Sequence, residues 1–190
     1  DYEFRTQLYN DNLLIALDMY LGTDYPIYQQ LGVPLYAIRQ FQPGYITRDC
    51  MHQMGLNLIN YRNQGNDLLD FMINKGKLLW FVKAMIPDLA DEVLFDYTPE
   101  QMAWAKQNEG LVWAFMIDNE VLYSSEPDYN QKFILEGPFT SYFGQESPPR
   151  LGAYIGYKIV DHYMQRNGEV TLELLMQEYD APKILKGSKY

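Results

Sequence analysis

The first part of the chain combines one short apolar run with many helix breakers. The segment NLLIALDMYLG, residues 12–22, holds its apolar run between polar Asn12 and Asp18, which predicts one buried strand followed by a loop. A single strand cannot satisfy its own backbone hydrogen bonds, so we expect it to pair with residues 2–8 or with a segment upstream of this chain. From there to residue 45 we expect loops with one or two short helical turns, because the segment is broken by Pro26, Gly32, Pro34, Pro43 and Gly44.

From residue 47 onward, the spacing of apolar residues predicts helices almost throughout. Thr47 can cap a helix that continues to about residue 62. Asn66 or Asp67 can cap a longer helix, which continues to residue 86 and stops before Pro87. The next helix has the clearest start signal in the chain, in Thr98 and the residues that follow it.

At that start signal, the Thr98 hydroxyl and the Gln101 amide can each satisfy a free backbone donor of the other, with Pro99 at the first helical position. The helix that follows should carry residues 102 to about 121.

The last third of the chain predicts an irregular stretch over residues 124–149, around one short helix. A helix over about 150–167 follows, and Thr171 and Asp180 each cap a short final one. We find no internal repeats and no linker. The pattern therefore predicts one domain over residues 1–190, mainly α with a small β element (α+β).

Composition and charge narrow the class of partner. The chain is 47% hydrophobic and 21% charged, which is ordinary for a globular protein, and its net charge is −10. An acidic surface repels nucleic-acid phosphates and anionic membranes, so we expect no nucleic-acid partner. No stretch approaches the roughly 18 apolar residues of a membrane span, and the first residues do not have the pattern of a signal peptide.

The chain contains few residues of the types that bind metals or form disulfides. The single cysteine, Cys50, excludes an internal disulfide. His52 and His162 lack the paired spacing of a zinc site, so we expect each to be a hydrogen-bonded surface or core histidine. Neither a metal nor another cofactor is predicted. The aromatic content of 15% favours filling of the gaps between helices, with a glycan or peptide groove as the alternative.

The segment FMINKGKLLWF, residues 71–81, places four unusual residues, Asn74 to Lys77, inside an apolar helix. A zincin-type hydrolase carries two His one turn apart on such a helix, with a Glu beside the first as general base. Here Leu78 cannot bind a metal, and Lys75 places a cation where a base beside a dication would be required. Downstream, the segment NEGLVWAFM offers Glu109 on a helix, which alone is a weak metal signal.

Several segments together resemble the gliding-motility lipoprotein GldB family. The most specific are GKLLWF with PD following, YTPEQMAWAKQNE and ESPPRLGAYIGYKIV, and the resemblance covers the chain from about residue 12 to its end. It implies an N-terminal lipid anchor that is absent from this chain, since Cys50 lies too deep to carry it. It also implies a cell-envelope location, facing the periplasm or the cell surface, and unidentified envelope proteins as partners.

The family is also distantly similar to a group of zinc peptidases, which implies a zincin-like (metallopeptidase-like) helical domain. On that scheme Asn74 and Leu78 occupy the two His positions, Lys75 the position of the general base, and Glu109 that of the third ligand. The helix order matches a peptidase, while the residues contradict zinc-peptidase activity.

The lysines of this helix suggest a replacement for the metal. Gly76 would allow close approach of a neighbouring helix or bulky side chain, and Lys75 or Lys77 would turn toward the vacated cleft and pair with Glu109 or Glu136. In the alternative, both lysines lie on a solvated helix face.

A second candidate region is GPFTSYFGQESPPRLGAYIGYKIV. The pair Gly152 and Gly156 favours helix packing over ligand binding, and Arg150 at a helix start is a candidate anion site or a tether through Glu146 or Glu136. The full candidate cleft comprises Asn74, Lys75, Lys77, Glu109, Glu136, Arg150, Tyr154 and Tyr157.

The function expected from this reasoning is that of a non-catalytic envelope domain which acts through protein–protein interaction with a degenerate peptidase-like cleft. One alternative is a peptide- or glycan-binding module with an aromatic-lined groove. Another is a hydrolase that uses Glu109 and Glu136, which would require both carboxylates in one pocket and at least one raised pKa. No catalytic residue is assigned.

Overall fold

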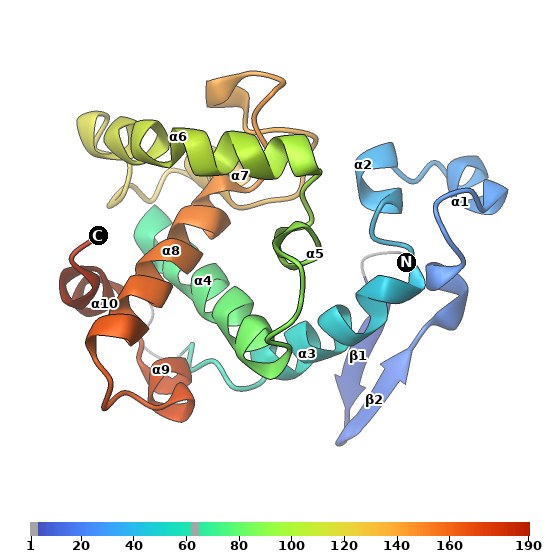
Figure 1. Ribbon diagram of the computed structural model, residues 1–190, viewed down its shortest axis with the longest axis horizontal. Coiled ribbons are helices and arrows are strands. Elements are labelled where there is room, and N and C mark those ends of the chain that lie inside the picture. The colour runs from blue at the N-terminus through green and yellow to red at the C-terminus, as the bar shows by residue number, and fades with distance from the viewer. Residues whose placement is uncertain (1–3, 62–64) are drawn as a thin grey trace.

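The computed structural model describes residues 4–61 and 65–190 of the chain. Figure 1 shows a helical body, residues 68–190, joined by α3 (Ile46–Leu56) to a smaller N-terminal lobe, residues 4–45. At the centre of the body, α4 (Leu68–Met85) and α8 (Leu151–Arg166) cross each other. The other helices of the body surround this pair: α5 (Asp91–Phe95), α6 (Pro99–Asp118), α7 (Pro127–Phe133), α9 (Leu172–Gln177) and α10 (Ala181–Ser188).

Glycines set the distance between the two central helices. A Cβ added to Gly76 of α4 would lie 2.3 Å from the carbonyl oxygen of Gly156, and a Cβ added to Gly156 would lie 1.9 Å from the carbonyl oxygen of Met72. Both positions therefore require glycine for the backbones to approach so closely. This confirms the expectation that Gly76 admits a neighbouring helix and that Gly156 serves packing. Gly152 packs in the same way against α7, since its added Cβ would lie 2.9 Å from the Phe133 carbonyl oxygen.

The helix starts follow the predicted caps except at α3. Thr47 does not cap that helix, because the turn over residues 43–45 runs directly into it, and α3 ends at Leu56 rather than near residue 62. The Thr98 hydroxyl accepts from the Gln101 N–H at 3.2 Å while the Gln101 side chain accepts from the Thr98 N–H at 3.0 Å. Asp67 forms the same reciprocal box with Asp70 at the start of α4. Thr171 and Asp180 cap α9 and α10. The helix α5 was not predicted, because five residues between two loops carry too short a pattern to be distinguished.

The N-terminal lobe corrects one prediction. The strand β2 (Asn12–Ile15) pairs with β1 (Thr6–Tyr9) in an antiparallel hairpin, with Leu8 opposite Leu13. The partner is therefore the preceding segment of the chain. The strand is not buried, however, since Leu14 is 54% exposed and Ile15 is 37% exposed. The apolar run predicts a core strand, whereas the structure places it at the surface. The lobe continues as η2 (Leu17–Tyr20), α1 (Pro26–Gln30), α2 (Leu35–Ile38) and η3 (Pro43–Tyr45). The last three of these lie where one or two short helical turns were predicted, and η2 lies where a loop was predicted.

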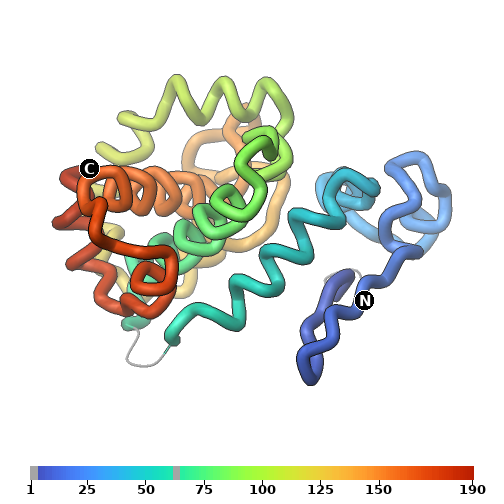
Figure 2. The backbone as a smooth tube through the Cα atoms, turned by 60° about the horizontal axis from the view of Figure 1, so that its bottom comes forward, coloured from blue at the N-terminus to red at the C-terminus, as the bar shows by residue number. Residues whose placement is uncertain are grey.

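The described residues form two hydrophobic cores, a large one in the body and a small one in the lobe. The lobe's own core consists of Tyr28, Val33, Ala37, Ile38 and Phe41. Figure 2 shows the lobe set apart from the body, with α3 running between them. Among the described residues, no helix is both long enough and apolar enough to span a membrane.

Polar contacts through Asp96 join the lobe to the body. Asp96 is 1% exposed and follows α5 with a left-handed φ of 53°. Its carboxylate accepts hydrogen bonds from Arg39 at 3.1 Å, Gln40 at 2.8 Å and Tyr45 at 3.1 Å, and from Arg150 of the body at 3.4 Å. The joint is thus made of charges and hydrogen bonds, and the pocket described below opens beside it, with Gln40 and Arg150 in its lining.

Candidate functional site

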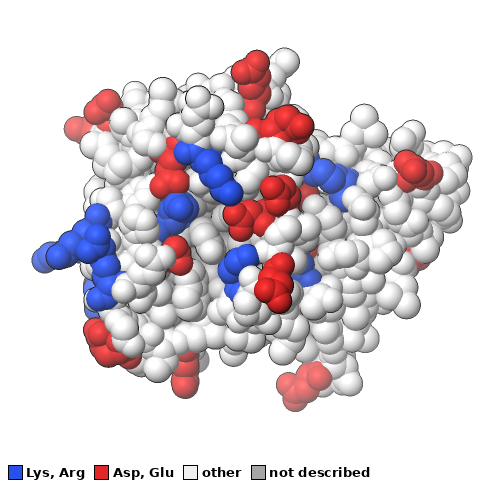
Figure 3. Space-filling model, viewed as in Figure 1, with Lys and Arg blue, Asp and Glu red and all other residues white. Residues whose placement is uncertain are grey.

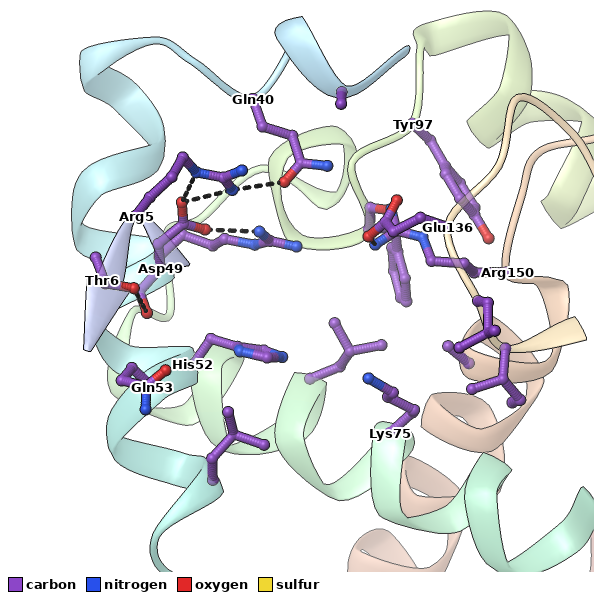
Figure 4. Close-up of a pocket in the computed structure, with 18 of the residues that line it drawn as sticks. Arg5, Thr6, Gln40, Asp49, His52, Gln53, Lys75, Tyr97, Glu136 and Arg150 are labelled. Carbon is purple, nitrogen blue, oxygen red and sulfur yellow. Dashed lines mark hydrogen bonds and ion pairs between the residues drawn. The ribbon is translucent and has the colours of Figure 1, made fainter. Parts of the chain in front are cut away.

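A pocket of about 640 Å³ lies between the lobe and the body. It is lined by side chains of β1, α2, α3, α4 and the start of α8, together with the segments around residues 95–97 and 134–136. Figure 4 shows polar side chains from these elements arranged around the open space. In the space-filling view of Figure 3, acidic and basic side chains lie close together over the middle of the face.

One wall of the pocket comes from α3 and β1. Asp49 accepts from Arg5 at 3.0 Å and from Arg48 at 2.7 Å, and the Tyr20 hydroxyl donates to it at 2.8 Å. Burial opposes ionisation of Asp49, but Arg48 and Arg5 outweigh it and hold the pKa of the carboxyl below its usual value. Asp49 is therefore a stable anion that orients both guanidinium groups.

Arg150 forms the opposite wall. It stands at the N-cap of α8 with a left-handed φ of 55° and donates to Glu136 at 2.8 Å and to the Phe95 carbonyl at 2.8 Å. The predicted tether is therefore Glu136. Burial opposes the charge, but Glu136 and Asp96 together raise the pKa of the Arg150 guanidinium above its usual value.

Lys75 and His52 complete the lining from α4 and α3. Burial lowers the pKa of Lys75, and the nearby charges of Arg150 and Arg48 lower it further, against the opposing effect of Glu136. Burial, followed by the charges of Arg48 and Lys75, also lowers the pKa of His52 to about 3. The imidazole is therefore neutral at neutral pH, and the charges in the pocket are those of the Arg, Lys, Asp and Glu residues.

Donor atoms of the pocket lack partners among the described residues. The Nε atoms of Arg48 and of Arg150 are buried and make no hydrogen bond. The side chains that carry them are 8% and 14% exposed, respectively. The Lys75 ammonium likewise makes no hydrogen bond or ion pair with residues 4–61 or 65–190. Buried donors such as the two Nε atoms usually have partners, and the partly buried Lys75 lines the pocket without one, so this arrangement is suited to an anionic ligand.

The structure brings together half of the candidate cleft. Lys75, Glu136, Arg150 and Tyr154 line the pocket. The others lie elsewhere: Asn74 is half-buried on α4, and Tyr157 packs edge-on against Phe95 with ring centroids 5.1 Å apart.

Lys77 does not reach the pocket. It is fully buried on another face of α4, where its ammonium donates to the Glu178 carbonyl oxygen at 2.6 Å. The expectation that both lysines lie on a solvated face is therefore wrong. The hypothesis that a lysine replaces the metal and pairs with a glutamate is met only in part. Lys75 and Glu136 line the same pocket, but no ion pair joins these two described residues.

Glu109 does not line the pocket, because it lies beyond Tyr154. It accepts hydrogen bonds from the hydroxyls of Tyr154 at 3.0 Å and of Tyr190 at 2.9 Å, with Lys158 at 3.8 Å. It therefore pairs with neither Lys75 nor Lys77. The two-carboxylate arrangement of Glu109 with Glu136 in one pocket is wrong as well.

The sequence reasoning missed the wall formed by α3 and by the residues at the start of β1, to which Arg48, Asp49 and the preceding Arg5 contribute. These residues have no recognisable spacing along the chain. The adjacent pair Arg48 and Asp49, at the start of a predicted helix with apolar neighbours, was the one available signal, because charged residues among apolar ones are buried only when paired.

The positions of potential metal ligands were compared with the pocket. Within the part of the chain that the structure describes, no three His, Cys, Asp or Glu side chains come together in a group that could hold a metal ion. At the positions of the peptidase scheme, Leu78 is 2% exposed in the core and Lys75 lines the pocket.

The fold and the pocket define a mainly helical protein with a charged pocket between a small lobe and a larger body. Comparison with protein families identifies it further. The chain belongs to the family described as gliding motility protein GldB, whose model matches residues 1–190. Searches of curated proteins and of solved structures find no match. The family is one of lipoproteins by its name, which indicates the cell envelope.

Proposed function

We propose that this chain is a non-catalytic domain of a cell-envelope lipoprotein, which binds another envelope component at the pocket between the lobe and the body. The observation that carries the proposal is the set of side chains that line the pocket. Cationic side chains line it, among them the Lys75 ammonium, which has no partner among the described residues, and Lys75 stands where a zinc peptidase of the proposed distant likeness would place its general base. Such a pocket can bind a ligand, and its two carboxylates, Asp49 and Glu136, are each engaged by an arginine, which disfavours their use as a general base.

The absence of catalysis is tested by elemental analysis. The purified protein is incubated with zinc, dialysed and examined by plasma mass spectrometry together with a peptide-hydrolysis assay. We expect no retained zinc and no hydrolysis. Stoichiometric zinc with hydrolysis would contradict the proposal.

Binding to an envelope component is tested by photo-crosslinking in cells. A photoreactive amino acid replaces Leu135, which lines the pocket and is 57% exposed. The matched control is Leu174 on α9, which is also 57% exposed and does not line the pocket. We expect one discrete adduct with an envelope protein at Leu135 and none at Leu174. Equal labelling at both positions would count against the pocket as the binding site.

A second candidate, a peptide- or glycan-binding module, has one observation in its favour. Tyr36, Phe95, Tyr97 and Tyr154 line the same pocket. Phe95, Tyr97 and Tyr154 pack on one another, however, with ring centroids 5.2 to 6.4 Å apart, which uses much of their surface in the core. Titration with peptides and with oligosaccharides distinguishes this candidate, which requires saturable binding of one of them.

A further inference from the structure

The cationic residues of the pocket outnumber its anionic ones. Arg5, Arg48, Lys75 and Arg150 line it, against Asp49 and Glu136, and His52 is neutral. With Lys75 protonated, the lining thus carries two more positive than negative charges, in a protein whose net charge is −10. Concentrating positive charge in a buried site is costly unless an anion compensates for it.

The donors without partners come from three separate elements. Arg48 belongs to α3, Lys75 to α4 and Arg150 to the N-cap of α8. All three line one pocket, and Arg48 and Arg150 lie close enough to Lys75 for their charges to act on it. Figure 4 shows Lys75 and Arg150 extending toward the open space from the body, opposite the wall that carries Asp49 and His52.

The anions already present leave these donors unused. Asp49 accepts from the Nη1 atom of Arg48, and Glu136 accepts from the Nη1 atom of Arg150, so that the Nε atom of each guanidinium remains without a partner. Asp49 thereby orients one guanidinium, while Glu136, whose side chain is 52% exposed, lies at the rim.

We propose that this pocket binds a phosphate group, held by Arg48, Lys75 and Arg150. Three cationic side chains in one pocket suit the three free oxygens of a phosphate monoester, whereas a carboxylate offers two oxygens, and a dianion matches the excess of two charges. The volume of about 640 Å³ exceeds that of a phosphate, and the remaining wall includes Leu79 and Ile134. The ligand is therefore an organic phosphate with an apolar part, such as a soluble phosphate ester or a lipid headgroup.

This inference rests on the proposed function, since it takes the same pocket as the binding site, but it is tested on the purified protein alone. Phenyl phosphate is titrated by calorimetry, with benzoate as the carboxylate of similar size. We expect saturable binding of phenyl phosphate at least about tenfold tighter than that of benzoate. Equal affinity for phenyl phosphate and benzoate overturns the inference. Failure to bind both phenyl phosphate and the anionic vesicles described next overturns it as well.

A second arm identifies the source of the phosphate. Vesicles containing phosphatidic acid, whose headgroup is a phosphate monoester, are compared with vesicles of neutral lipid in a sedimentation assay. Binding to the anionic vesicles that depends on Lys75, with or without phenyl phosphate binding, supports a lipid headgroup. Binding of phenyl phosphate alone supports a soluble ester.

Two variants with opposite expected effects test the pocket. Lys75→Gln should weaken phenyl phosphate binding at least about tenfold, because a hydrogen bond to a charged group is lost. Glu136→Gln should tighten it several-fold, because a competing carboxylate is removed from Arg150. The matched control is Lys106→Gln on α6, which removes the same charge from a residue 59% exposed and outside the pocket.

The outcomes separate folding from binding. Lys75 has no partner among the described residues, so Lys75→Gln should melt at the same or a higher temperature than the wild type. An unchanged affinity in both Lys75→Gln and Glu136→Gln overturns the phosphate site. Failure of photo-crosslinking with intact phosphate binding would instead overturn only the envelope partner.

Discussion

At the scale of single residues, two lysines two positions apart on α4 have different environments. Residues two apart on a helix do not share a face, so Lys75 reaches the pocket while Lys77 is enclosed by the body and bonded to the Glu178 carbonyl. The sequence could not separate them, because the residues that surround each lysine come from helices remote in the chain. Lys77 is thus a buried ammonium with a structural role.

Lys77 makes stability depend on pH. Its burial lowers the pKa to about 8, against the opposing charge of Glu178, whereas in the unfolded chain it has the ordinary lysine value of 10.5. Between pH 8 and 10 the unfolded state therefore binds more protons. The free energy of unfolding should rise with pH in this window, by up to about 1.4 kcal/mol per pH unit from this residue.

Urea unfolding of the wild type and of Lys77→Met, at intervals from pH 7 to pH 10, measures this contribution. Lys77→Met should show a smaller rise with pH, and the difference between the two proteins cancels the effects of the tyrosines. The control Lys106→Met should follow the wild type. Parallel curves for wild type and Lys77→Met would exclude the effect.

At the scale of elements, the crossing of α4 and α8 governs the body. No side chain separates the two backbones where Gly76 meets Gly156. The helices can cross here because both sequences supply glycine at the same level, even though glycine in a helix interior lowers helix stability by about 1 kcal/mol. Packing outweighs propensity at this place.

Gly156→Ala should destabilise the protein by about 3 kcal/mol or more, because its Cβ would lie 1.9 Å from the Met72 carbonyl oxygen and the helices would have to move apart. Gly110→Ala on α6 is the matched control, since nothing lies within 4 Å of its added Cβ. That change should be neutral or stabilising by up to about 1 kcal/mol. Urea unfolding compares the two, and equal losses would refute the role of the crossing.

The elements that were predicted correctly are those with local signals. Thr98 with Gln101, Thr171 and Asp180 cap helices through residues three positions away, so the information lies within one turn. The exposed hairpin and the pocket wall were not predictable in this way. Leu14 resembles a core residue in sequence, and Arg48 becomes a pocket residue only because α4 and α8 lie opposite α3.

At the scale of the whole molecule, the described residues comprise two cores of very different size. The small core of the lobe cannot bury much apolar surface, and the lobe is held to the body through α3 and through Asp96. Small units of this kind open more easily than the core to which they are attached. The lobe should therefore be the less stable part of the molecule.

Hydrogen exchange followed by mass spectrometry tests this division. Amides of α2 should exchange faster than those of α4 in the wild type. Asp96→Asn keeps a residue type that tolerates a positive φ but removes the charge between Gln40 and Arg150, so it should accelerate exchange in α2 more than in α4. A uniform acceleration throughout the molecule would mean that the lobe and the body unfold as one unit.

The cationic pocket lies in a molecule whose net charge is −10, and this has a consequence for how an anion reaches it. At low salt, where the Debye length reaches about 30 Å at 0.01 M, the approach is dominated by the acidic surface as a whole. A small anion passes this barrier and gains the pocket's attraction at short range, whereas a long polyanion is repelled along its entire length. Salt screens the outer repulsion more than the buried contacts, so association should become faster as ionic strength rises, contrary to ordinary electrostatic steering.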